Sequence, residues 1–392
     1  MNSIKIATKM CIGCGLCHSE FNLKFKQDNK GFLIIDDTIS PECQDFINNV
    51  CPVVGNSFSD ESCKDIWGER IEVYEGFSTN KDIRKQASSA GVITSLGLHL
   101  LKSDLIDGII HIGADKTTVY KTQTIISSDE ESLVNNCGSR YSISSPWYNL
   151  KNLIDPSKKY MAIGKPCDIT ALRNARDRLH LYENIIYLVS FFCAGLPSNT
   201  ANQKLLKELC CNEENCIGLR YRGNGWPGYA TAIDKQGNEH ALEYSKAWGG
   251  ILGRDVHNLC RICIDGIGLN SDIACGDLWY LDKDNPDFTE RDGRNIIITR
   301  TPLGEELLKQ AIAAGYISCS KYDNFEDLKK IQKYQYTRRA TMKAKIIANK
   351  ILLRPVPKYN KKMITKYSKM IPFSERKKVF LGTVKRILTK KI

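Results

Sequence analysis

Short apolar runs alternate with segments of helical periodicity through the middle of the chain, from Glu72 onward. Four of the apolar runs predict buried strands: Ile106–Gly113, Tyr160–Gly164, Ile185–Phe192 and Arg294–Thr299. Three segments have apolar residues at helical spacing and predict helices: Ala87–Leu101, Asp168–Leu179 and Pro302–Ala314. Repeated strand–turn–helix units of this kind are typical of an α/β domain.

Turn residues dominate the stretch from Gly218 to Asp277, where glycines and a proline follow one another closely. Loops this dense often surround a site. We therefore expect a mixed α/β (α+β) domain over residues 72–335, with a loop-rich region that carries chemistry.

Cysteines at ferredoxin spacing mark the N-terminal part of the chain. Cys11, Cys14 and Cys17 form a C-x2-C-x2-C run, and a proline follows Cys51. Bacterial ferredoxins bind a 4Fe-4S cluster with this pattern, and the glycines between the cysteines permit the tight turn. The pattern predicts a ferredoxin-like module over residues 1–57 with one cluster. A structural zinc site and buried thiols without a metal are the alternatives.

Four further cysteines suit a second cluster: Cys167, Cys193, Cys260 and Cys263. The first two directly follow predicted strands, at the sheet edge where open α/β sheets bind ligands. The other two form a C-x2-C pair on a later loop. Because a cubane needs four thiolates but not contiguous ones, the set predicts a second 4Fe-4S cluster. A zinc ion and ordinary buried cysteines remain alternatives, and Cys275 is a reserve ligand.

Composition and charge indicate the cellular compartment and the class of partner. The 392 residues include 16 cysteines, and the N-terminus has no apolar signal-like segment, so we expect a reducing cytoplasm rather than a disulfide scaffold. No apolar run reaches the roughly 18 residues of a spanning helix. The net charge of +12 comes from residues 338–392, which alone carry +17 and leave residues 1–337 at −5. The body is therefore mildly acidic, and we expect no nucleic-acid partner.

The basic tail, residues 338–392, ends in a predicted amphipathic helix. Its apolar residues recur at helical spacing from Val379 to Ile392, with basic residues between them. Such a helix can lie on an anionic membrane surface, which predicts a peripheral location at the inner face of the membrane. A helix that packs on the protein body with a basic rim is the alternative.

Two small-residue motifs could contact a phosphate. Gln86–Gly91 is predicted to open a helix with Ser88, Ser89 and Gly91, so free N–H groups and hydroxyls would be available there. In Gly138–Tyr141, Arg140 could bind a phosphate and Tyr141 could stack on a ring. Simple capping and turn roles explain both motifs equally well.

Taken in order, several motifs resemble the coenzyme F-420 hydrogenase/dehydrogenase beta-subunit family over about residues 1–320. They are Gln86–Gly91, Gly138–Tyr141, Gly164–Ile169, Phe192–Gly195, Gly223–Gly228, Cys260–Cys263 and Asp272–Asp277. The resemblance implies an FAD-binding iron–sulfur fold, with FAD near Ser88, Ser89, Gly91, Arg140 and Tyr141. It also implies a link to surface-polysaccharide synthesis, since stand-alone members with a ferredoxin module and a basic tail are associated with it. The family's Gly-Gly is Ala90-Gly91 here.

The leading functional hypothesis is a flavin-dependent iron–sulfur oxidoreductase. In it, the two clusters exchange single electrons with FAD, and FAD exchanges a hydride with an organic substrate. Asp168, Asp265 and Asp277 are the candidate proton relays. The partner is a soluble electron carrier: ferredoxin, a reduced deazaflavin or a nicotinamide. The rival hypotheses are a non-catalytic electron-transfer subunit and an iron–sulfur scaffold.

Overall fold

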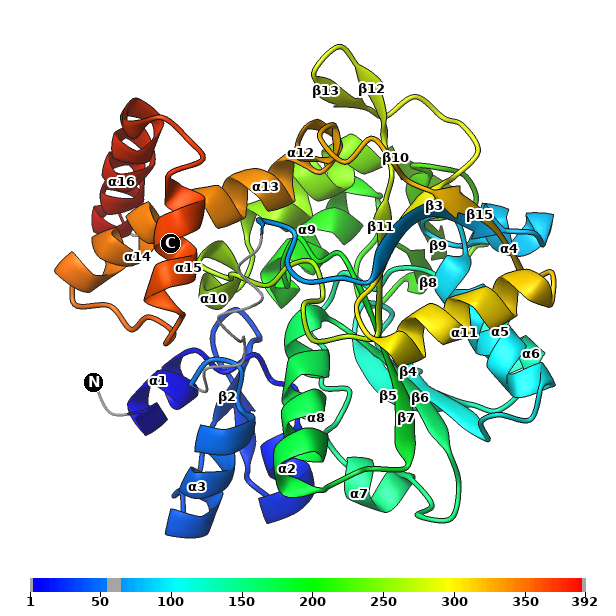
Figure 1. Cartoon of the computed structure of the whole chain (residues 1–392), viewed down its shortest axis with the longest axis horizontal. Helices are drawn as coiled ribbons and strands as arrows, with labels where there is room; N and C mark the ends of the chain where they lie inside the picture. The colour runs from blue at the N-terminus through cyan, green and yellow to red at the C-terminus, as the bar shows by residue number, and fades with distance from the viewer. Residues whose placement is uncertain (1–2, 55–64, 390–392) are drawn as a thin grey trace.

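The computed structural model describes residues 3–54 and 65–389, so the predicted module end at residue 57 lies outside the described residues. The fold is mixed α/β, as predicted, around an eight-stranded sheet (Figure 1). Across the sheet the strands run β15 (Ile317–Lys321), β3 (Glu72–Ser78), β14 (Asn295–Thr299), β11 (Ile273–Asp277), β7 (Ile185–Phe191), β6 (Tyr160–Gly164), β4 (Gly108–Ala114) and β5 (Thr122–Ser127).

The centre of this sheet is parallel. Strands β4, β6, β7 and β11 run in one direction, whereas β14, β3, β15 and β5 pair antiparallel with their neighbours. All four strands predicted from apolar runs are present, as β4, β6, β7 and the antiparallel β14, because both faces of the sheet are covered there and the runs are buried. The carboxyl ends of β6 and β7 therefore lie side by side.

Helices cover both faces of the sheet. On one face, α5 (Val92–Lys102) and α11 (Pro302–Ala313) pack on the strands, and α4 (Lys81–Gln86) and α6 (Glu130–Asn135) flank α5. On the other face, α8 (Pro166–Leu179) lies over β6 and β7. One predicted helix start was wrong: residues 87–91 link α4 to α5, because Gly91 has φ +75° and serves as the N-cap of α5.

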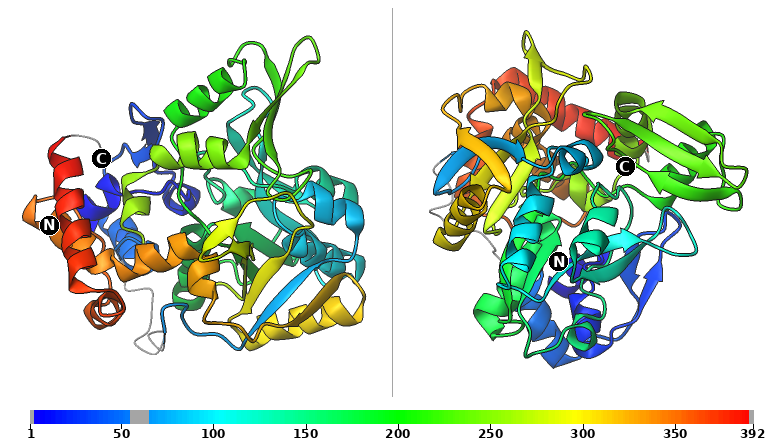
Figure 2. Two further views of the ribbon diagram at one scale, coloured as in Figure 1. Left: turned by 90° about the horizontal axis from the view of Figure 1, so that it is seen from above. Right: turned by 90° about the vertical axis from the view of Figure 1, so that its right-hand side faces the viewer.

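The loop-rich interval contains more structure than predicted. A three-stranded antiparallel sheet forms from β8 (Cys216–Arg220), β9 (Tyr229–Asp234) and β10 (Glu239–Glu243), and it projects from the main sheet (Figure 2). Beside it lie α9 (Asn199–Glu208), the π-helix η2 (Ser245–Ile251) and the 3-10 turn η3 (Leu252–Arg254). The short helix α10 (Asn258–Arg261) and the hairpin of β12 (Tyr280–Asp282) with β13 (Asn285–Asp287) complete the interval.

The N-terminal residues form a small unit of their own. It contains α1 (Ser3–Lys9), α2 (Leu16–Phe21), the hairpin of β1 (Phe25–Gln27) with β2 (Leu33–Ile35), and α3 (Pro41–Val50). The unit packs on the body through α3 against α8 and α2 against α7 (Leu150–Leu153). The backbone N–H of Trp147 donates to the carbonyl of Cys14 (2.9 Å), which ties the cysteine run to the body.

The basic tail is helical, and it packs on the body. Helix α12 (Leu328–Ile331) and the start of α13 (Lys333–Ala340) precede the tail. The tail contains the end of α13 and the helices α14 (Met342–Ile351), α15 (Lys361–Ser368) and α16 (Phe373–Leu388). The predicted boundary between residues 335 and 338 falls inside α13, whose Arg339 is fully buried and donates to the carbonyl of Ile264.

The terminal helix α16 packs on α14 and leaves apolar Leu381 and Leu388 exposed. This arrangement favours the packed-helix alternative over a helix dedicated to a membrane. In the part of the chain that the structure describes, every helix is too short or too polar to cross a membrane.

Candidate iron–sulfur site

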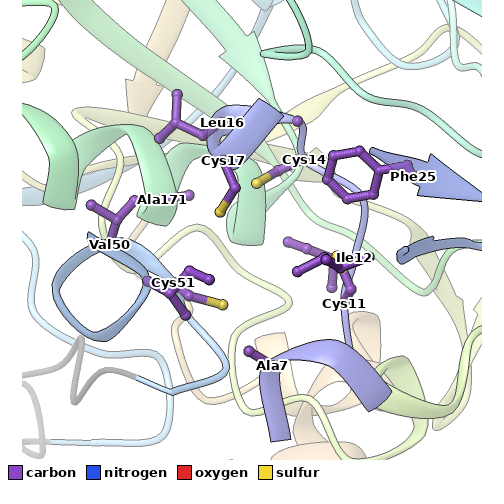
Figure 3. A pocket seen from close by; sticks show the side chains of 13 residues that line it. Ala7, Cys11, Ile12, Cys14, Leu16, Cys17, Phe25, Val50, Cys51 and Ala171 are labelled. Atoms are coloured by element: carbon purple, nitrogen blue, oxygen red, sulfur yellow. The ribbon is translucent and has the colours of Figure 1, made fainter. Parts of the chain in front are cut away.

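Four cysteines of the N-terminal unit line one cavity. Cys11 and Cys14 come from the turn before α2, Cys17 from α2 itself, and Cys51 from the end of α3. Figure 3 shows their side chains around the same space, with apolar neighbours such as Phe25 and Val50. The structure thus brings the predicted first set together.

Glycine shapes the turn that carries these cysteines. Gly13 has φ +68° and Gly15 has φ +92°, a region that other residues rarely adopt. A Cβ on Gly15 would lie 2.4 Å from the backbone of Tyr148, so the close approach of the unit to the body also requires glycine. The turn points the Gly13 N–H at the Cys11 sulfur (3.4 Å).

The first set is suited to a positively charged metal centre. Burial raises the pKa of the Cys11 thiol to about 12, and the thiols of Cys14, Cys17 and Cys51 each have a raised pKa for the same reason. Each further negative charge in the set raises the pKa of its neighbours. Four buried thiolates are stable only where bound iron compensates their charge, so the donor set fits a cluster.

The second predicted set also converges, from three elements. Cys167 lies in the first turn of α8, Cys193 follows β7, Cys260 lies on α10, and Cys263 follows α10. The charge of Cys193 and Cys263 acts on both Cys167 and Cys260, so all four thiols are electrostatic neighbours. Burial raises the pKa of Cys260 to about 12 and that of Cys263 to about 11.

Backbone contacts hold this second set in place. The Leu196 N–H donates to the Cys260 sulfur (3.3 Å), and the Cys193 N–H donates to the carbonyl of Gly266 (2.8 Å). The guanidinium of Arg338, from α13, donates to the Cys193 carbonyl (2.9 Å). The tail therefore contributes directly to the surroundings of the second set.

The two sets meet at the N-terminal turn of α8. The buried carboxylate of Asp168 acts electrostatically on Cys14 of the first set and on Cys167 of the second. Ala171, one turn later, lines the cavity of the first set. A single helix end thus separates the two groups of four thiols.

Neither set resembles a site for a single ion. Among residues 3–54 and 65–389, no group of three or more His, Cys, Asp or Glu side chains is placed to hold one metal ion. The four thiolates of a cubane each bind a different iron, so they lie farther apart than the ligands of one ion. The reserve ligand Cys275 lies within β11 among apolar side chains of the sheet, apart from both sets.

Of the three candidate proton relays, Asp168 is the one whose charge acts on a cysteine of each set, Cys14 and Cys167. Its carboxylate accepts from the Lys165 ammonium (2.6 Å), which also donates to the Ser144 hydroxyl (2.6 Å). Burial raises the pKa of Asp168, while Lys165 opposes that shift. Its second oxygen has no hydrogen-bond partner in the described structure.

The other two carboxylates serve the structure. Asp265 accepts from the N–H groups of Ile267 (3.2 Å) and Leu269 (3.1 Å) beside Cys263. Asp277 forms a two-point ion pair with buried Arg222 (2.7 and 2.8 Å) and accepts from the Trp226 indole (2.8 Å). These bonds occupy both oxygens of the Asp277 carboxylate with protein partners.

The serines expected near FAD already have protein partners. The Ser89 hydroxyl donates to Asp277 (2.8 Å) and accepts from Asn295 (2.6 Å). The Ser88 hydroxyl accepts from the Ser139 N–H, and a Cβ on Gly91 would lie 2.9 Å from Ile83. The segment therefore faces the protein interior, and these groups as they stand do not fit a phosphate.

The second expected FAD motif is equally engaged. Arg140 is half-buried and donates to the carbonyls of Leu219 (3.0 Å), Val119 and Lys121 (3.2 Å). Tyr141 packs on Trp248, with the ring centroids 4.7 Å apart. The terminal nitrogens of Arg140 thus bind backbone carbonyls, and its Nε has no hydrogen-bond partner in the described structure.

The sequence did not indicate two basic residues that lie beside the cysteine sets. Lys165 lies in the motif Gly164–Ile169 but was given no role, and Arg338 lies in no motif, so only the fold shows its contact with Cys193. Sequence reasoning also missed an aromatic cluster around Arg222, in which Trp226 stacks on Trp279 with centroids 4.5 Å apart. Trp226 lies in the motif Gly223–Gly228, and this motif was the one feature of the sequence that pointed to the aromatic cluster.

Comparison with known proteins agrees with this architecture. The N-terminal region of the coenzyme F420 hydrogenase/dehydrogenase beta subunit family matches residues 73–151, and its C-terminal region matches residues 157–325. A chain of the F420-reducing [NiFe] hydrogenase complex from Methanosarcina barkeri has a similar fold, with a TM-score of 0.53 and 20% identity. That match covers 72% of this chain and 95% of the other.

Curated relatives match most of the chain. An uncharacterized protein of Methanocaldococcus jannaschii is 26% identical over 355 residues, covering 83% of this chain and 92% of that protein. The coenzyme F420 hydrogenase subunit beta of Methanothermobacter thermautotrophicus is 23% identical and covers 74% of this chain and 99% of that subunit. The chain therefore belongs to the coenzyme F420 hydrogenase/dehydrogenase beta subunit family.

Proposed function

We propose that this protein is an iron–sulfur electron-transfer subunit of an oxidoreductase. The observation that carries the proposal is the gathering of eight cysteines into two groups of four, which adjoin across the first turn of α8. Cys11, Cys14, Cys17 and Cys51 would hold one 4Fe-4S cluster, and Cys167, Cys193, Cys260 and Cys263 the other. When bound, each cluster supplies one-electron redox chemistry.

The chain's own residues set the conditions for this chemistry. Apolar side chains around the first set exclude water, which limits the reorganisation that accompanies a change of charge. Asp168 between the sets adds a negative charge that Lys165 balances. Arg338 adds a positive charge beside the second set. Such fixed charges tune the reduction potentials of the two sites relative to each other.

A subunit role agrees with the relatives, which are named as beta subunits of hydrogenases and formate dehydrogenases. The proposal does not include FAD at the five residues expected from the resemblance, since the serine hydroxyls and the terminal nitrogens of Arg140 are already bonded. Flavin, a deazaflavin or nicotinamide partner, a polysaccharide substrate and a peripheral membrane location stay predictions from sequence. Flavin analysis and vesicle flotation test two of them.

The test is an anaerobic reductive titration of the reconstituted full chain, followed by visible absorbance. The proposal predicts a broad iron–sulfur absorbance that bleaches with one-electron donors. A protein that gains no such absorbance with iron and sulfide would refute it. Flavin bands that bleach by two electrons would instead support the flavin-dependent enzyme predicted from sequence.

A further inference from the structure

Four basic residues gather beside the second cysteine set. They come from four elements: Arg261 from α10, Arg338 from α13, Lys345 from α14 and Arg386 from α16. The charges of the three arginines all act on Lys345 and, together with burial, lower its pKa to about 8. We call Arg261, Lys345 and Arg386, with the neighbouring Tyr334, the basic surface.

Part of this positive charge faces the second cysteine set, since the charges of Cys193, Cys260 and Cys263 act on Arg338. Farther out, Lys345 and Arg386 form no ion pair with a carboxylate among the described residues, and Arg386 donates to the hydroxyl of Thr383 (3.3 Å). Asp255, whose charge acts on Arg261, is already paired with Lys30 (2.7 Å). The exposed outer part of this charge therefore suits an anionic partner from outside.

The basic surface is accessible and adjoins the thiols. Arg386 is exposed, and Tyr334 is 52% exposed although its hydroxyl donates to the carbonyl of Ala194 (2.9 Å). The charges of Cys193, Cys260 and Cys263 act on Tyr334, so the ring lies next to the second set. In Figure 1, α10, α13, α14 and α16 lie on the same side of the molecule.

We propose that the basic surface is the docking site of an acidic electron-carrier protein, which exchanges single electrons with the second cysteine set. This inference rests on the proposed function. In each transfer the carrier loses one electron as this protein gains one, or the reverse, and no bond forms or breaks. Arginine and tyrosine are frequent anchors of protein interfaces, and complementary charge steers the encounter of two redox proteins.

A matched pair of variants on one helix tests the proposal. Arg386 and Lys377 are both exposed on α16, nine residues apart, which places them on roughly opposite sides of the helix. Arg386→Glu and Lys377→Glu change the net charge equally. The probe is a small acidic ferredoxin in its oxidised state, titrated calorimetrically into the reconstituted full chain at low salt.

We expect Arg386→Glu to weaken the Kd for ferredoxin about tenfold and Lys377→Glu to change it less than about twofold. The difference should shrink at high salt, because exposed charges are then screened. Unchanged binding by Arg386→Glu would overturn the proposal, and so would equal weakening by both variants.

Flotation of the same variants with vesicles that contain phosphatidylglycerol is a second measurement. If Arg386→Glu weakens vesicle flotation but leaves ferredoxin binding intact, the surface binds lipid and the proposal is wrong. Iron content separates this inference from the proposed function. A wild-type chain that holds both clusters but does not bind ferredoxin refutes only the docking site, whereas a wild-type chain that binds no iron refutes the proposed function.

Discussion

Single cysteines decide whether each cluster forms. Cys14→Ser removes one ligand of the first set, and we expect iron per chain to fall from about eight to about four because the second set is built from other elements. Iron and sulfide analysis after anaerobic reconstitution measures this. Cys43→Ser is the control, since Cys43 is buried near Cys17 but lies outside the four. Equal iron loss in both variants would contradict the assignment.

At the same scale, Asp168 and Lys165 form a buried ion pair between the two sets. Asp168→Asn leaves the ammonium buried without its counter-charge, which we expect to lower the free energy of unfolding by about 3 kcal/mol. Removing both charges, with Lys165→Met and Asp168→Asn, should restore most of this loss. Urea unfolding under anaerobic conditions measures both. A single variant as stable as the wild type would refute the pairing.

Individual ligands were predictable from sequence where their spacing or strand position carried chemistry. The run Cys11, Cys14, Cys17 follows from local spacing, and Cys167 follows from its position after a strand. Arg338 was not predictable, because its contact with Cys193 joins residues 145 positions apart through tertiary packing alone. The role of Gly91 could not be decided from sequence, since positive φ in a cap and close approach to a phosphate both favour glycine.

Among the elements, the pair β4–β5 contains a buried histidine. The ring of His111 bonds the Ser127 hydroxyl (2.8 Å), and burial lowers its pKa to about 4. The folded state thus favours the neutral ring, whose contribution is complete above the unfolded pKa of about 6.5 and is lost as pH falls toward 4. Between about pH 7.5 and 5.5 the loss is about 1 kcal/mol.

Thermal unfolding of His111→Gln and the wild type at these two pH values measures the effect. The Tm of the wild type minus the Tm of His111→Gln should become smaller, or change sign, at the lower pH. His180→Gln is the control, because His180 is exposed and should show no such change. A pH dependence that is identical in wild type and His111→Gln would contradict the role of His111.

The tail helices give a second prediction for elements. Met363 on α15 is fully buried, whereas Met370 after the same helix is 45% exposed. Met363→Ala should lower the free energy of unfolding by about 3 kcal/mol, and Met370→Ala by less than about 0.5 kcal/mol. Chemical denaturation compares the two. Similar small losses in both variants would mean that α15 does not belong to the folded body.

Strands were predictable from sequence where both of their faces are buried. Strands β4, β6 and β7 of the parallel centre are continuous apolar runs, so their existence and approximate ends followed from sequence, whereas β11 was not predicted. The sheet of β8, β9 and β10 was missed because its strands are short and half-exposed and lie among glycines. The packing of α16 on α14 could not be chosen from sequence, since an amphipathic face fits a protein surface and a membrane equally.

In the whole molecule, three parts meet around α8. Cys14 of the N-terminal unit lies near the start of α8, α8 itself supplies Cys167, Cys193 follows β7, and the tail contributes Arg338 beside the second set. Residues far apart in sequence therefore form one region. The matched family regions cover residues 73–151 and 157–325, so the first set and most of the tail lie outside them.

The number of iron atoms bound per chain tests this account most directly. The full chain is reconstituted anaerobically with iron and sulfide, desalted, and analysed for iron, sulfide and protein. Two 4Fe-4S clusters predict about eight iron and eight sulfide per chain. About four iron per chain, with the same value in Cys14→Ser, would leave the first set without a cluster and contradict the two-cluster account.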